Sequence, residues 1–360
     1  MFSSIDRRRF LGSSLLASSS LAFARDFELK VPDPSAAWFL IGDTHYLANI
    51  ENPEKMDEAS QATNQNLIDQ LNRLPGSLIP ENAGGGSVAQ TSGVIHAGDL
   101  IDSGDKDSPN HRKMQRTEWS NYAADYGLTG QDGRLKLPLY EVYGNHDSPS
   151  GDGHAVKQIV ERNKKRPGLV NVSDNGLHYS WDWGGVHFVN LGIVVGEVAE
   201  VVRKRRYHPR DSLKFLQVDL LDRVGNSGRP VVLTHHIDVA RYSTDPLPTG
   251  PATSAEWDPA DVHAYYLAIR DFNVIAIQYG HTHARNIYRW DGTAKRGEIG
   301  IPTFNVDNSA HFASKAQAIF YFQFGEGELV VREIATGDRW ETINWTPQVW
   351  RSQVVESIAR

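Results

Sequence analysis

The sequence contains no cysteine among its 360 residues. Disulfide bonds, thiolate zinc sites and cysteine nucleophiles are therefore all excluded. Downstream of residue 24 the chain also lacks any run approaching about 18 uninterrupted apolar residues, so we expect no membrane span. The glycine run at 84–86 is not followed by the Gly-Lys-Ser/Thr of a phosphate-binding loop, which favours a flexible surface loop instead.

Positive charge is also in short supply, because 37 Lys and Arg face 44 Asp and Glu and leave a formal charge of −7. A general attraction to nucleic acid or to anionic membranes is not expected from this balance, and we expect no stable nucleic-acid partner. With 40% apolar and 22% charged residues, the composition is that of an ordinary soluble globular protein.

The N-terminal segment 1–24 has the pattern of a targeting signal. Arg7-Arg8-Arg9-Phe10-Leu11 is followed by a short apolar, serine-rich stretch, and Ala22-Phe23-Ala24 has the small-x-small form of a cleavage site. The pattern resembles a twin-arginine export signal, and an ordinary secretory signal is the alternative. We therefore expect an exported protein, periplasmic or extracellular. Through the twin-arginine route, cargo would cross the membrane folded, with any metal already bound.

Five apolar runs are typical of buried strands, and amphipathic helical patterns stand between several of them. The expected strands are 38–41, 94–97, 139–143, 230–234 and 274–279, and the expected helices are 53–74, 111–126, 211–224 and 258–270. A hairpin is expected at 179–191, and strands at 286–290, 301–306, 317–324 and 329–334 follow. This pattern predicts an α/β fold in which residues 25–360 form one domain.

A metal-binding side chain follows each of the five apolar runs. The segments are Asp43-Thr44-His45, Gly98-Asp99, Gly144-Asn145-His146-Asp147, His235-His236 and Gly280-His281-Thr282-His283. In open α/β sheets, ligand-binding groups gather beyond the carboxyl ends of the strands, so these segments predict one shared metal centre. Two ions about 3.5–4 Å apart need one bridging carboxylate and about three further ligands each, which these segments supply.

The five motifs, in this order, resemble the calcineurin-like metallophosphoesterase superfamily, whose pattern is Asp-x-His, Gly-Asp, Gly-Asn-His-Asp/Glu, His and Gly-His-x-His. The resemblance implies a four-layer α/β/β/α sandwich and two divalent metal ions, with zinc, manganese and iron all compatible with such ligands. It implies hydrolysis of phosphate esters by a hydroxide that bridges the metals. The implied ligands are Asp43, His45 and His283 for one metal, Asn145, His235 and His281 for the other, and Asp99 between them.

The resemblance also implies two catalytic side chains that are not ligands. His146 would lie over the metals, stabilise the transition state and protonate the leaving oxygen, and Asp147 would orient His146. The hairpin at 179–191 is similar to one in purple acid phosphatases, but Asp102 stands where those enzymes have a tyrosine. A ferric, coloured centre is therefore not expected.

His235 and His236 require a choice, because neighbouring side chains of a strand point to opposite faces. The single histidine of the family motif matches the first of the pair, so His235 is the expected ligand. His236 is expected near the site, either in contact with the substrate phosphate or behind the ligands. The basic run 203–206 could be a lid that contacts the phosphate or a solvated surface segment. Tyr242 and Trp257, in the loop 241–258, could line the substrate pocket or pack in the core.

The expected function is therefore metal-dependent hydrolysis of a phosphate ester outside the cytoplasm. The substrate could be a monoester or a diester of a small molecule, a lipid or a nucleotide. The alternatives are a metal-binding scaffold that has lost turnover, against which the intact His146 argues, and a nuclease, against which the acidic charge argues. Nothing in the sequence indicates the oligomeric state.

Overall fold

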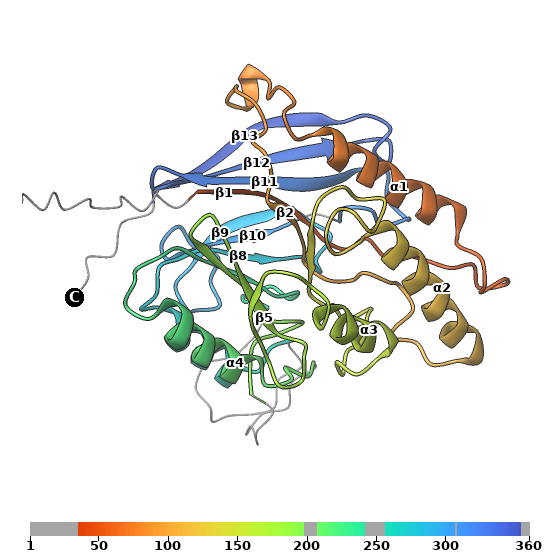
Figure 1. Cartoon of the computed structure of the whole chain (residues 1–360), viewed down its shortest axis with the longest axis horizontal. Helices are drawn as coiled ribbons and strands as arrows, with labels where there is room; N and C mark the ends of the chain where they lie inside the picture. Colours follow the sequence, from red (N-terminus) through yellow and green to blue (C-terminus); the bar gives the residue numbers. More distant parts are fainter. Residues whose placement is uncertain (1–34, 198–206, 242–255, 307, 354–360) are drawn as a thin grey trace, which may run out of the picture. The chain divides into compact units, whose positions relative to one another are not determined.

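The computed structural model describes residues 35–197, 207–241, 256–306 and 308–353, and Figure 1 traces their path. The expected signal at 1–24, the basic run 203–206, and Tyr242 with most of the loop 241–258 lie outside the described residues. Among those described, no helix combines the length and apolarity that crossing a membrane requires.

The first sheet has six strands in the order β13-β12-β11-β1-β2-β3. Its parallel half joins β1 (Ala36–Ile41), β2 (Gly93–His96) and β3 (Leu139–Glu141). Its antiparallel half joins β11 (Gln317–Gly325), β12 (Glu328–Thr336) and β13 (Asn344–Gln353). Strand β1 is buried along its whole length, as a central strand covered on both faces should be.

The second sheet has seven strands in the order β4-β5-β6-β7-β8-β10-β9. Parallel pairing links β6 (Val186–Asn190), β7 (Val231–Thr234), β8 (Val274–Tyr279) and β10 (Ile301–Asn305). Antiparallel strands close both edges, namely β4 (Leu169–Val172) with β5 (Tyr179–Trp183), and β9 (Asn286–Trp290). The expected hairpin at 179–191 is confirmed as the β5–β6 pair, which turns at a Gly-Gly dipeptide.

The two sheets pack face to face through alternate residues of their strands. Trp38 of β1 stacks on Phe322 of β11 at 5.0 Å and meets Phe188 of β6 edge-on at 5.0 Å. The intervening residues of β1, such as Phe39 and Ile41, belong to a second apolar cluster that also contains the buried side chains of the helices. The molecule therefore has the expected α/β/β/α layering, with the site at the carboxyl ends of the parallel strands.

The helices are α1 (Glu58–Arg73), α2 (Pro109–Asp125), α3 (His154–Asn163), α4 (Ser212–Asp219) and α5 (Pro259–Ile269), and a π-helical turn, Leu220–Val224, extends α4. Capping side chains set several boundaries. Asp57 accepts from Ser60 N and starts α1 at Glu58, so the expected helix at 53–74 begins too early. Asp258 starts α5 in the same way, with Pro259 in the first turn.

Two strands were missed in the sequence. β4 lies in the polar segment 148–176 with three half-buried residues and an exposed Val172, while β13 is an edge strand whose exposed and half-buried residues follow no regular alternation. Neither strand carries the apolar run or the strict alternation that identifies a strand from its sequence.

Candidate metal centre

The site begins with unusual backbone conformations directly after the parallel strands. Ten residues other than glycine have a positive φ among those described, and five of these are predicted site residues. They are Asp43 (φ 53°), His45 (42°), Asp99 (55°), His281 (74°) and His283 (50°). Such conformations are costly for residues other than glycine and concentrate at functional sites. Here they turn the side chains that follow β1, β2 and β8 into one space.

Glycines in the motifs make room for the acidic side chains. A Cβ atom on Gly144 would lie 2.2 Å from Oδ1 of Asp99, and one on Gly280 would lie 2.4 Å from Oδ2 of Asp43. Non-bonded contacts this short do not occur for a Cβ atom, so a larger residue at either glycine would displace the carboxylate. The glycines of the Gly-Asn-His-Asp and Gly-His-x-His motifs are therefore required for packing around the site.

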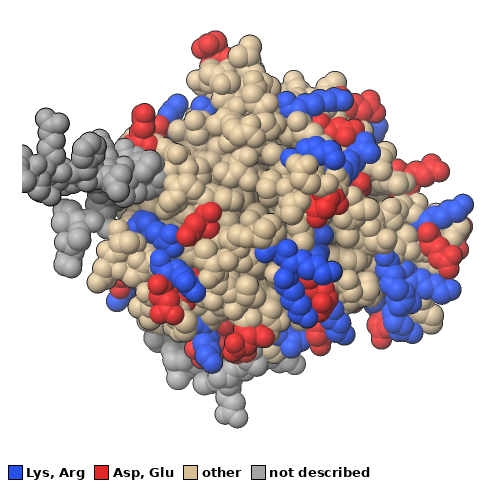
Figure 2. All heavy atoms as spheres, in the orientation of Figure 1, with Lys and Arg blue, Asp and Glu red and all other residues tan. Residues whose placement is uncertain are grey.

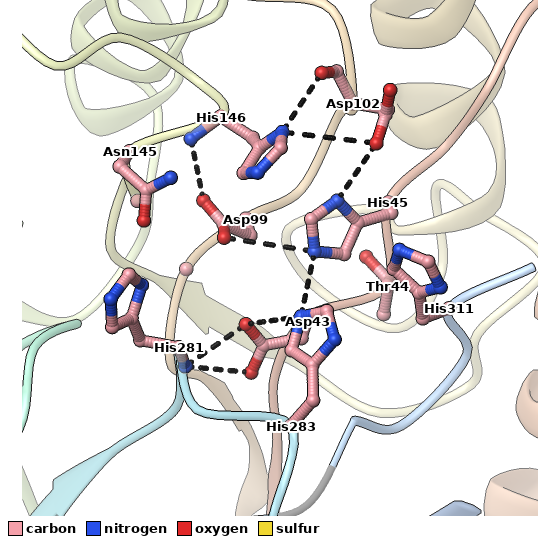
Figure 3. Close-up of polar contacts among 12 residues, drawn as sticks. Asp43, Thr44, His45, Asp99, Asp102, Asn145, His146, His281, His283 and His311 are labelled. Carbon is pink, nitrogen blue, oxygen red and sulfur yellow. Dashed lines mark hydrogen bonds and ion pairs between the residues drawn. The ribbon is translucent and has the colours of Figure 1, made fainter. Parts of the chain in front are cut away.

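One group of candidate ligands comprises Asp43, His45 and His283, whose donor atoms all lie within 4.8 Å of one another. Nε2 of His45 lies 3.2 Å from Nε2 of His283, which in turn lies 3.5 Å from Oδ1 of Asp43. The carboxylate of Asp43 also accepts the backbone N–H of His281 at 2.9 Å. Figure 3 shows these side chains converging from separate segments.

A second group comprises Asp99, His236 and His281, again with donor atoms within 4.8 Å of one another. Nε2 of His236 lies 3.2 Å from Oδ2 of Asp99 and 3.1 Å from Oδ1 of Asn145. The same Oδ2 lies 3.6 Å from Nε2 of His45 in the first group. Asp99 therefore stands between the two groups.

The choice between the two adjacent histidines is corrected by this geometry. The side chain of His236, not that of His235, reaches Asp99 and Asn145. His235 is fully buried and packs against the rings of Trp257, Tyr265 and Tyr279. The single-histidine motif was aligned one residue too early: both histidines follow β7, which ends at Thr234, and the first of them packs into the aromatic core. Trp257 is buried in the core, which is one of the two roles expected for it.

His146 lies beside the cluster, but Asp147 does not orient it. Nδ1 of His146 donates to the backbone carbonyl of Asp102 at 3.0 Å and lies 3.8 Å from the Asp102 carboxylate. The carboxylate of Asp147 instead accepts the backbone N–H groups of Leu100, Ile101 and Gly144, at 2.7 to 3.2 Å. Asp147 therefore holds the loops after β2 and β3 together, and Asp102 takes the role that we expected for Asp147.

The electrostatics of the cluster centre on Asp99 and His236. Burial alone would raise the pKa of Asp99, but the His236 imidazole holds it well below its usual range. Burial alone would lower the pKa of His236, but the Asp99 carboxylate raises it to about 9. Buried charges of opposite sign in contact stabilise each other's charged form. In the metal-free protein, His236 is therefore protonated beside an ionised Asp99.

The residues present fit divalent metal ions. Nδ1 of His281 is buried without a hydrogen-bond partner among the described residues, and its ring belongs to the second group of ligands. A buried acceptor of this kind is costly unless something binds it. Imidazole nitrogens mixed with carboxylate and amide oxygens suit zinc, manganese or iron.

Three residues at the site were not anticipated. Asp102 contacts Nδ1 of His45 at 3.2 Å, Glu256 contacts Nε2 of His281 at 2.9 Å, and the ring of His311 lies 4.6 Å from that of His45. The spacing of Asp102, three residues after Asp99, could have placed it on the same loop. Glu256 lies in the loop 241–258, which we considered only for Tyr242 and Trp257, and neither Glu256 nor His311 belongs to a recognisable motif.

Comparisons with known proteins identify a family. The family model described as "Calcineurin-like phosphoesterase" matches residues 39–285, about two thirds of the chain. A search of curated proteins found no significant match.

Several solved structures resemble the chain at low identity. Vacuolar protein sorting 29 from Cryptosporidium parvum is 11% identical (TM-score 0.32), and the alignment covers 89% of this chain and 100% of that one. GAP50, described as the anchor in the inner membrane complex of Plasmodium, is 9% identical (TM-score 0.42), covering 87% and 88%. The calcineurin-like phosphoesterase YfkN from Bacillus subtilis is 11% identical (TM-score 0.38), covering 90% and 92%.

The matched residues extend from within β1 to just beyond β8, and they include all five strand-end motifs and both groups of candidate ligands. The chain therefore belongs to the calcineurin-like phosphoesterase family.

Proposed function

We propose that this protein hydrolyses phosphate esters at a centre of two divalent metal ions. Asp43, His45 and His283 would hold one ion, His236, His281 and Asn145 the other, and Asp99 would lie between them. The observation that carries the proposal is the position of Asp99, whose Oδ2 atom lies 3.6 Å from His45 and 3.2 Å from His236. Two ions in such a site would supply positive charge for the phosphate oxygens and would activate a water molecule.

In the proposed reaction, His146 is the side chain that donates a proton. Its Nδ1 carries a proton, because the Asp102 carbonyl that faces it can only accept a hydrogen bond. Its other ring nitrogen is therefore the one that can deliver a proton to a departing oxygen. Burial alone would lower the pKa of His146, but Asp99 and the Asp102 carbonyl raise it, which favours the protonated form. Figure 3 shows the ring beside Asp99 and His45.

The substrate class that we propose is a phosphate ester of a small molecule, a lipid or a nucleotide, rather than a nucleic-acid strand. On the face shown in Figure 2, acidic and basic side chains are interspersed, without the continuous basic surface that a nucleic acid requires. The net charge of −7 supports the same choice.

The function is tested with purified protein loaded with zinc, manganese or iron and then offered p-nitrophenyl phosphate and bis(p-nitrophenyl) phosphate. We expect release of p-nitrophenol with at least one metal, and we expect Asp99→Asn to abolish it. Glu328→Gln is the matched control, because Glu328 pairs with Arg351 at the sheet edge. Bound metal without turnover of either ester would instead identify a metal-binding scaffold. Equal turnover in wild type and Asp99→Asn would refute the assignment.

We also propose export of the protein, based only on the signal pattern in residues 1–24. N-terminal sequencing of protein recovered from the periplasm or medium should begin at residue 25. Recovery of the uncut chain from the cytoplasm alone would contradict export.

A further inference from the structure

The position of Glu256 is fixed by the elements around it. The residue is 5% exposed and lies two positions before Asp258, whose side chain caps the first turn of α5. Trp257, between them, is buried against the ring of His235. A glutamate with buried and capped neighbours has little freedom to move, so its contacts define where its charge lies.

One oxygen of Glu256 faces a candidate metal ligand. Oε1 lies 2.9 Å from Nε2 of His281. A carboxylate can only accept at this distance, so the ring proton of His281 resides on Nε2. Nδ1 then carries the lone pair, and this buried atom has no hydrogen-bond partner among the described residues, while His281 itself belongs to the second group of ligands.

The other end of His281 is also held. Its backbone N–H donates to both oxygens of Asp43, at 2.9 and 3.0 Å. The residue thus has its backbone attached to a carboxylate of the first group and its ring attached to Glu256. With both ends fixed, the lone pair of Nδ1 keeps one direction.

Arg241 holds Glu256 in position for its contact with His281. The guanidinium pairs with the second oxygen of Glu256, and the Glu256 N–H donates to the Arg241 carbonyl at 3.3 Å. The guanidinium of Arg241 balances the negative charge of Glu256, which would otherwise add to the charges of Asp43 and Asp99.

We propose that Glu256 is a positioning residue for the second metal, which holds His281 with its proton on Nε2 and directs Nδ1 toward the ion. Carboxylates behind a ligating histidine commonly have this effect, since they set the tautomer and orientation and make the imidazole a stronger ligand. The inference rests on the proposed function, because it requires a metal at Asp99, His236 and His281.

Calorimetric titration of the metal-free full-length protein with Zn²⁺ tests this role. Wild type should bind two equivalents. Glu256→Gln keeps the shape but loses the charge, and it should weaken one of the two binding steps about 10- to 100-fold while leaving the other unchanged. Glu256→Ala should weaken the same step at least as much, and Glu328→Gln should behave as wild type. Two unchanged steps in both Glu256 variants would overturn the inference and leave the proposed function standing.

The position of the proton is measured separately with ¹⁵N-labelled histidine. Long-range ¹H–¹⁵N spectra of the wild type should show His281 protonated on Nε2, both without metal and with Zn²⁺ bound. In Glu256→Ala the metal-free protein should populate both tautomers. A proton on Nδ1 of His281 in the zinc-loaded wild type would overturn the inference. Loss of the Nε2 proton of His281 when zinc binds, with Glu256 itself binding the zinc, would also overturn it. A wild type that binds no zinc at all would instead remove the proposed function, and this inference with it.

Discussion

Nε2 of His236 lies 3.2 Å from Oδ2 of Asp99, while the ring of the preceding His235 is stacked on Tyr279 in the core. Adjacent residues at the end of β7 thus have unrelated roles. We predict that His236→Leu removes the second metal and lowers turnover at least 100-fold. His235→Leu should keep both metals and most of the turnover, because it exchanges one buried side chain for another of similar volume. Metal content and steady-state rates of both variants test this prediction. Loss of metal and turnover in His235→Leu but not in His236→Leu would identify His235 as the ligand.

The same ion pair predicts how the stability of the metal-free protein depends on pH. The folded pKa of His236, about 9, lies above its ordinary value of 6.5. The stabilisation from this proton is therefore complete below pH 6.5 and is lost as the pH rises through 9. Urea unfolding in EDTA should show stability falling across this window, with a smaller fall in His236→Leu. An identical pH dependence in both proteins would contradict the pairing.

The sequence predicted that these strand-end side chains lie close together, but it did not predict all the contacts that hold them in place. Strand-end motifs could be recognised because polar ligands follow apolar runs, and residues from Asp43 to His283 do come together. The choice between His235 and His236 failed because it depends on where β7 ends, and strand boundaries are uncertain by more than one residue. The role given to Asp147 failed because the carboxylate serves backbone N–H groups, which no side-chain pattern records.

Contacts between distant loops account for the remaining omissions. Glu256 meets His281 across 25 residues, and His311 meets His45 across 266, with no motif at either loop residue. The strands β4 and β13 were missed for a different reason, since their exposed edges need no apolar run. Periodicity identifies what is buried in a core, whereas these features depend on tertiary placement.

His146 should separate catalysis from metal binding. We predict that His146→Ala binds both metals but loses about 10²- to 10⁴-fold in turnover, as expected for loss of a general acid. An ester with a p-nitrophenolate leaving group needs little protonation, so its loss should be smaller than that of an alkyl ester. Comparing the two esters in wild type and variant measures this difference. Equal losses on both would assign His146 to charge stabilisation rather than proton transfer.

Glu141, at the end of β3, supports the loop that carries Asn145 and His146. Its fully buried carboxylate pairs with Arg162 and Arg166, each at 2.7 Å. Glu141→Gln would leave buried guanidinium charge without its partner and should lower the free energy of unfolding by about 3–5 kcal/mol. Urea titration at neutral pH measures this loss, and Glu328→Gln, at a more exposed ion pair, should lose no more than about 1 kcal/mol.

The pH dependence of that pair has the opposite sign to that of His236. Burial alone would raise the pKa of Glu141, but the two arginines lower it to about 2, below its ordinary value of 4.5. Its stabilisation is therefore complete above pH 4.5 and is lost as the pH falls through 2. The difference between wild type and Glu141→Gln should shrink on acidification over this window, and a difference that grew would contradict the assignment.

Metal removal should abolish turnover without unfolding the protein. The two apolar clusters of the α/β/β/α sandwich contain no site ligand, so the sheets do not depend on an ion for their packing. Dialysis against a chelator should leave the far-ultraviolet circular dichroism unchanged. Free metal at 100 times its dissociation constant should then raise the free energy of unfolding by about 2.7 kcal/mol per ion, because it binds only the folded state. Reconstitution with zinc, manganese and iron in turn, with unfolding and ester hydrolysis measured on the same samples, would show which ion restores both. If the chelated protein kept full turnover, chemistry without metal would have to explain the clustered carboxylates and imidazoles.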